Sequence, residues 1–129
     1  MRFEIYDTIG NKMVLKDEES YLMISVNATH SLQLSFQEFK NLYVNIYAAF
    51  AAKEYKKIFF DSFVAEVDSS FLQKVSLHFY EDFGYEYMKD IPVLLIEMNR
   101  GAFIDFCKIV SKIFHHIGYG DSDEWIVVF

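Results

Sequence analysis

The stretch LSFQEFKNLYVNI, residues 34–46, carries a complete signal for the start of a helix. Ser35 is a favoured N-cap residue, and Glu38 stands three residues later, where its side chain can reach back to the Ser35 N–H in a capping box. Leu34 and Phe39 have the spacing of a hydrophobic staple. Apolar residues then recur at three- and four-residue intervals, so the sequence predicts an amphipathic helix that begins after Ser35.

A second start of the same kind lies in MNRGAFIDFCKIV, residues 98–110. Met98, Asn99 and Phe103 repeat the order of apolar residue, N-cap and apolar residue. The capping box is absent, because Ala102 occupies the position that the glutamate holds in the first stretch. Apolar residues at helical spacing follow again, so we predict a second helix after Asn99.

A β-hairpin is predicted before each helix. Residues 21–34 and residues 85–98 each contain two strand-like runs around a four-residue turn. Further strand-like runs are RFEIYD or KMVL in the first half, VSLHFY in the second half, and WIVVF at residues 125–129. The sequence therefore predicts two units of β-meander followed by helix, and then a C-terminal strand. A common hairpin–helix pattern without true duplication would give the same signal.

The segment between the two units, residues 51–75, is predicted to be helical up to a turn at residues 68–70. Its apolar residues are Ile58, Phe59, Phe63 and Val67. The chain has 129 residues, of which 53% are hydrophobic, five are glycine and one is proline. A single domain over residues 1–129 is expected from this length and from the lack of a linker-like segment. The predicted fold class is α+β, with a mainly antiparallel sheet and the helices packed on one of its faces.

The charge balance limits the kind of partner. Nineteen acidic residues against twelve basic ones give a net charge of −7, which argues against direct binding of nucleic acid or of an anionic membrane surface. Acids at positions 4 and 7 interrupt the apolar core that an export signal would need, and the longest nearly apolar run is too short to span a bilayer. One cysteine, Cys107, cannot form an internal disulfide. We therefore expect a soluble cytoplasmic protein.

No stretch of the sequence carries a recognised catalytic or cofactor motif. A phosphate-binding loop, a dinucleotide-binding glycine pattern and a nucleophile elbow are all absent from the sequence. His115 and His116 precede several acids, but adjacent helical residues point about 100° apart and rarely share one metal ion. Cys107 falls beside Phe106 on the predicted second helix, where a buried, inert thiol is expected. We predict no catalytic residue, no metal site and no cofactor.

The segment HFYEDFGYEYMKD, residues 78–90, combines rings and acids. Alternate residues of a strand point to opposite faces, so Phe79 is predicted to face the core while the even positions form an acidic stripe on the other face. A second acidic cluster surrounds the only tryptophan. The predicted partner-binding residues are Tyr80, Asp82, Glu86 and Asp90 in the stripe, and Asp121, Asp123, Glu124 and Trp125 in the second cluster. The alternative is that the stripe is an ordinary solvated sheet face.

Acids mixed with tyrosine and tryptophan suit a protein that blocks a basic cleft, because carboxylates can replace phosphates and rings can act as anchors. In its size, charge and lack of catalytic motifs, the chain resembles the immunity proteins that bacteria pair with nuclease toxins. We therefore expect an inhibitor of a basic protein partner, either a nuclease toxin or another nucleic-acid-binding effector. One alternative is a phage-encoded inhibitor of a host defence nuclease, similar to an anti-CRISPR protein. Two others are a small-ligand-binding or enzyme domain with an aromatic pocket, and a self-associating subunit.

Overall fold

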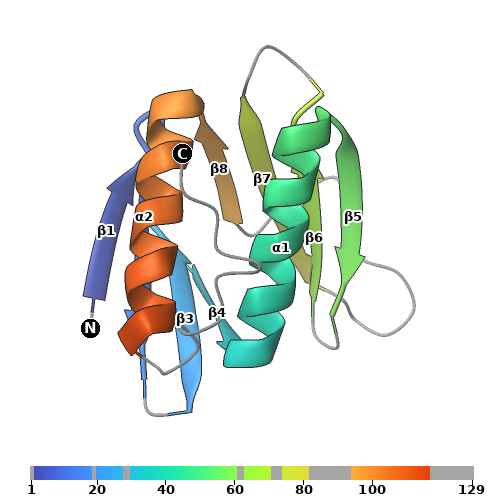
Figure 1. Ribbon diagram of the computed structural model, residues 1–129. Helices are drawn as coiled ribbons and strands as arrows, with labels where there is room; N and C mark the ends of the chain where they lie inside the picture. Colours follow the sequence, from blue (N-terminus) through green and yellow to red (C-terminus); the bar gives the residue numbers. More distant parts are fainter. Residues whose placement is uncertain are drawn as a thin grey trace.

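The computed structural model shows a chain that forms the same arrangement twice, four antiparallel strands followed by one helix (Figure 1). The residues that the structure describes are 2–18, 20–27, 30–60, 63–70, 74–81 and 94–116. The first unit consists of β1 (Arg2–Tyr6), β2 (Lys12–Asp17), β3 (Tyr21–Val26), β4 (His30–Ser35) and α1 (Phe36–Ala52). The second consists of β5 (Tyr55–Phe59), β6 (Phe63–Asp68), β7 (Val75–Glu81), β8 (Leu94–Met98) and α2 (Arg100–His116).

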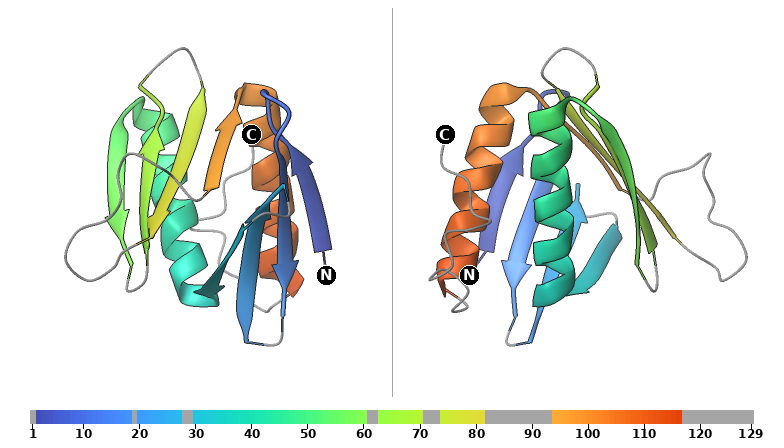
Figure 2. Two further views of the ribbon diagram at one scale, coloured as in Figure 1. Left: turned by 180° about the vertical axis from the view of Figure 1, so that it is seen from behind. Right: turned by 45° about the vertical axis from the view of Figure 1, so that its right-hand side comes forward.

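Each set of four strands forms its own sheet, in the order β1-β2-β3-β4 and β5-β6-β7-β8. The α+β class and the repeated strand–helix order are therefore confirmed, but there are two four-stranded sheets where the sequence analysis predicted one. The two sheets splay apart, and both helices lie on the same side of them (Figure 1 and Figure 2).

The two helices run antiparallel and pack through aromatic rings. Phe39 near the start of α1 meets Phe114 near the end of α2, with ring centroids 5.5 Å apart, and Phe50 meets Phe103 at 4.4 Å. Each helix crosses from its own unit to the other: α1 contacts β4 and also β5 and β6, whereas α2 contacts β8 and also β1. Because each helix packs against strands of both units, the two units share a single hydrophobic core.

Both predicted helix starts are confirmed. The Ser35 hydroxyl accepts the Glu38 N–H at 3.0 Å, and a Glu38 carboxylate oxygen accepts the Ser35 N–H at 2.9 Å, which completes the capping box. At the second helix, the Asn99 side-chain oxygen accepts the Ala102 N–H at 2.9 Å. The apolar residues that flank the two caps are fully buried: Leu34, Phe39, Met98 and Phe103.

The helical prediction for residues 51–75 is wrong for the described residues after Ala52. Helix α1 ends at Ala52, followed by Lys53 in the left-handed conformation with φ of 57°, and the chain then forms β5 and β6. The run Phe63–Val67 is buried on both faces of its strand, so it shows no two-residue alternation of polar and apolar residues. A short apolar run of this kind does not by itself distinguish strand from helix.

The second predicted hairpin is described at only one of its two runs. That run forms β8, which pairs with β7 in the register Val75↔Met98 to Phe79↔Leu94. Residues 85–88, the other run of that hairpin, and residues 125–129, the predicted last strand, lie outside the described residues.

Candidate binding face on the second sheet

The second sheet has one face toward the helices and one face away from them. On β6, Phe63, Ala65 and Val67 belong to the hydrophobic core, so the alternating positions point the other way. We call this second side the outer face. Its residues on the first three strands are Tyr55, Lys57 and Phe59 on β5, Val64, Glu66 and Asp68 on β6, and Ser76, His78 and Tyr80 on β7.

An apolar row crosses the outer face. Phe59 pairs with Val64, and Val64 pairs with Tyr80 on the next strand. Val64 and Tyr80 are buried, with exposed fractions of 0% and 4%, whereas Phe59 at the edge of the sheet is 65% exposed. The Tyr80 hydroxyl lies 3.3 Å from Nδ1 of His78. The row therefore ends in a large exposed ring on an edge strand.

A charged row lies beside it, formed by Lys57, Glu66 and His78 in register. Glu66 is buried but well satisfied, because its carboxylate accepts the Tyr55 hydroxyl at 2.7 Å and lies 3.7 Å from the Lys57 ammonium. Burial of a carboxylate is tolerated when it is hydrogen-bonded and paired in this way.

Asp68, in register with Tyr55, adds an exposed carboxylate to the outer face. The Ser70 hydroxyl and then the Ser70 backbone N–H, both bonded to this carboxylate, hold the pKa of Asp68 below its ordinary value. Asp68 makes no salt bridge to a lysine or arginine within the described residues. It therefore remains a negative group beside the Tyr55 ring.

The structure places only one of the eight predicted binding residues. Tyr80 lies on the outer face as expected from alternation, with its neighbour Phe79 in the core. At 4% exposure its ring presents little contact area in this conformation, and its role as an anchor stays a prediction. The other seven lie outside the described residues: Asp82, Glu86, Asp90, Asp121, Asp123, Glu124 and Trp125.

The net charge is unevenly distributed along the chain. The described residues include eleven acidic and eleven basic ones, so this part of the protein is formally neutral. The charge of −7 arises entirely from the remaining positions, which hold eight acids and one lysine. Six of those eight acids fall in two ring-rich segments, residues 82–93 and 117–129. The acidic character of the protein is therefore concentrated where the predicted binding residues are.

The outer face of the first sheet has a different character. Glu4 accepts a hydrogen bond from Arg2 at 2.6 Å and lies 3.5 Å from the Lys12 ammonium, and Lys16 pairs with Glu18. The bond from Arg2, followed by the charge of Lys12, lowers the pKa of Glu4. Exposed ion pairs of this type are typical of a solvated face and contribute little to stability.

The cysteine and histidines do not form a reactive cluster in the described part of the chain. Cys107 is 2% exposed, and burial raises the pKa of its thiol to about 11, against a smaller lowering by the Tyr43 hydroxyl. His115 is exposed, and His116 places Nε2 3.5 Å from Oδ2 of Asp17. Among the described residues, no three histidine, cysteine or acidic side chains come close enough to hold a metal ion.

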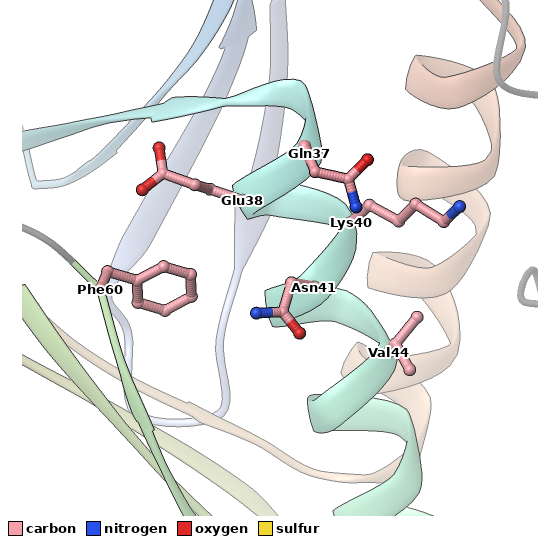
Figure 3. A pocket seen from close by; sticks show the side chains of 6 residues that line it. All are labelled: Gln37, Glu38, Lys40, Asn41, Val44 and Phe60. Carbon is pink, nitrogen blue, oxygen red and sulfur yellow. The ribbon is translucent and has the colours of Figure 1, made fainter.

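A shallow groove of about 320 Å³ lies along the exposed side of α1 (Figure 3). Its lining residues are Gln37, Glu38, Lys40, Asn41, Val44 and Phe60. Figure 3 shows Phe60 across from Glu38 and Asn41, whereas Lys40 and Val44 lie on the other side of the helix. Glu38 is already engaged in the helix cap. The groove therefore lacks polar groups that converge on one point, as a small-ligand site would require.

Tyr55, Phe59 and Glu66 were missed as site residues because their segment was interpreted as helix. The two-residue spacing of Tyr55, Lys57 and Phe59 was the signal in the sequence that could have indicated a strand.

Comparison with protein-family models, with curated proteins and with solved structures finds no match to this chain. Within the described residues, neither helix is long and apolar enough to cross a membrane.

Proposed function

We propose that the protein binds a basic protein partner and neutralises it, in the manner of an immunity protein that blocks a nuclease toxin. The observation that carries this proposal is the charge distribution. Residues 82–93 and 117–129 together hold six acids, one lysine and six rings, so they account for −5 of the total charge of −7. Carboxylates arranged in this way can occupy the positions of phosphates in a cleft that binds nucleic acid, and opposite charge accelerates association.

The rings supply the second requirement of a tight interface. Tyrosine and tryptophan are enriched among the residues that dominate binding energy, usually where a surrounding rim excludes water. The acidic segments contain Tyr85, Tyr87 and Trp125 among their rings, and the outer face adds Tyr55 and Phe59. Charge would thus steer the encounter, and the rings would slow release.

The main rival is an aromatic pocket between sheets and helices that holds a small ligand. The rings available for such a pocket are packed against one another: Phe39, Phe63, Phe79, Phe103 and Phe114 are each 0–1% exposed. A ligand would have to displace a close-packed core, which is unfavourable. The packing thus supports the binding-protein proposal over its rival.

The test is capture from the native host with the full-length chain as bait, followed by an activity assay. We expect a basic protein to be retained at low salt and released at high salt, because opposite charges that remain near water are screened. The released protein should cleave or bind nucleic acid, and an equimolar amount of this chain should block that activity. Full activity in the presence of bound, folded inhibitor would overturn the proposal.

A further inference from the structure

We infer that the rings of Tyr55 and Phe59, on the outer face of β5, form the apolar anchor at which the basic partner docks, with arginine side chains of the partner stacked on them. This inference rests on the proposed function and specifies the part of the described fold that takes part in it. The partner class is a protein surface rich in arginine, because both ring faces and neighbouring carboxylates favour a guanidinium group.

The placement of the two rings supports an anchor. Tyr55 and Phe59 are four residues apart on one strand, so they project from the same face, and they are 48% and 65% exposed. Among the strands that the structure describes, β5 is the edge of its sheet and pairs with β6 alone. Phe59 also forms the exposed end of the apolar row, so a partner that covers it would extend a buried apolar surface.

On the outer face, the charged side chains beside the rings are Glu66 and Asp68 against Lys57, a balance that fits a cationic occupant, whereas Lys56 lies on the opposite face of β5. Lys57, which lies between the rings, is 3.7 Å from the Glu66 carboxylate, so its charge is largely compensated. Asp68 stands opposite Tyr55 and keeps its negative charge to lower pH than usual, since Ser70 lowers its pKa. Beyond Tyr80, the chain continues into the segment with Asp82, Glu86 and Asp90. An arginine stacked on Tyr55 would thus find a carboxylate for its guanidinium hydrogen bonds.

A second copy of the chain fits the same strand poorly. If β5 paired with β5 of another copy so that Tyr55 met Phe59, the two-fold axis would pass through Lys57. Two lysines would then lie directly opposite each other, which is unfavourable for cross-strand pairs. Lysine on an edge strand is a known means of preventing such pairing. The strand is therefore better suited to a different protein than to itself.

The experiment is site-specific crosslinking in the native host. A photoreactive phenylalanine analogue replaces Phe59 in one full-length variant and Tyr6 in a control variant. Tyr6 is the matched position, because it ends β1 as Phe59 ends β5 and is 64% exposed. We expect a crosslink from position 59, and none from position 6, to arginine-containing peptides of a basic protein. The crosslink should disappear when Asp82, Glu86 and Asp90 are all replaced by lysine.

A kinetic measurement separates an anchor from a bystander. With the crosslinked protein purified, Phe59→Ser should increase its dissociation rate at least tenfold and leave the association rate within about twofold, while Tyr6→Ser changes neither. Equal crosslinking from both positions, a crosslink to a second copy, or unchanged release from Phe59→Ser would overturn the inference. If the chain inhibits a basic partner but gives no crosslink from position 59, this inference is wrong and the proposed function still holds.

Discussion

The Thr8 hydroxyl in the first unit accepts the backbone N–H of Asn99, the N-cap residue of α2, at 2.8 Å. In α1 the equivalent N–H, that of Ser35, is bonded to Glu38 within the same helix. The second helix has alanine in place of that glutamate, so its cap is completed by the other unit. Where the sequence of the second helix lacks the capping-box glutamate, Thr8 of the first unit therefore supplies the acceptor and joins the two units.

We expect Thr8→Val to lower the free energy of unfolding by about 1 kcal/mol, because it keeps the shape of the side chain and removes the acceptor of the Asn99 N–H. Urea unfolding followed by circular dichroism measures this change. Ser35→Ala is the comparison within one unit and should also lower the stability by about 1 kcal/mol. A Thr8→Val protein with the wild-type unfolding midpoint would show that water replaces the hydroxyl without loss.

Asp7 makes another link between the units, and its loss should destabilise the fold more than the loss of the Thr8 hydroxyl. Its carboxylate accepts the N–H of Ile9 at 3.0 Å and of Asn11 at 2.7 Å, the Asn11 amide at 3.2 Å, and the N–H of Glu97 across the units at 2.9 Å. Asp7→Asn turns an NH₂ group toward donors and removes the charge, so we expect a loss of roughly 2 kcal/mol in urea unfolding. The exposed Asp105→Asn is the control and should unfold within about 0.5 kcal/mol of the wild type. Equal midpoints for the two variants would contradict this assignment.

The parts of the fold that sequence predicted are those fixed by local chemistry. Ser35 with Glu38, and Asn99, define where both helices start, and each signal lies within a few residues of the chain. The strands β5 and β6 were missed because Phe63 to Val67 are buried on both faces, a property that only the assembled protein reveals. The contacts of Thr8 and Asp7 with the second unit join residues about ninety positions apart, and no single-sequence pattern encodes them.

The same distinction applies to the candidate site. The alternation of residues 78–80 predicted correctly which side of β7 faces the core. The exposure of Phe59 depends on β5 being an edge strand, which follows from sheet order and not from local sequence. The concentration of acids and rings in residues 82–93 and 117–129 can be read from the sequence alone.

Cys107 provides a prediction about pH. Burial raises the pKa of its thiol to about 11, above its ordinary value of 9.0, so the folded protein keeps the proton where the unfolded chain loses it. This group therefore stabilises the fold fully below pH 9, and that contribution is lost as pH rises from about 9 to 11. At pH 9 the ultraviolet absorbance of the thiolate should be nearly absent in the native protein, whereas about half of the thiol should be ionised in urea, because its pKa there is close to the ordinary value of 9.0. Rapid alkylation of the native thiol at pH 8 would contradict the buried state.

Neither Cys107 nor His115 is expected to take part in partner binding. The variants His115→Ala and Cys107→Ser should therefore both leave the affinity for the partner unchanged.

The last prediction concerns the acidic stripe, Asp82, Glu86 and Asp90. Replacing all three by lysine should abolish partner binding and leave the urea midpoint nearly unchanged, because a stripe that faces solvent, as predicted, contributes little to stability. The control reverses three acids of the described fold, Glu18, Glu54 and Asp105, for the same change in net charge.

If the stripe contacts the partner directly, only the first triple variant loses binding, whereas a general charge effect would weaken both equally. For the wild type, surface plasmon resonance should show association that slows as salt increases, since opposite charges steer the encounter. Truncation of Tyr80 or Trp125 to alanine should instead speed release and leave association nearly unaltered, as expected for anchors. Binding that survives the stripe reversal or ignores salt would mean that the stripe is a solvated face, and the cluster of Asp121, Asp123, Glu124 and Trp125 would then be the surface to mutate.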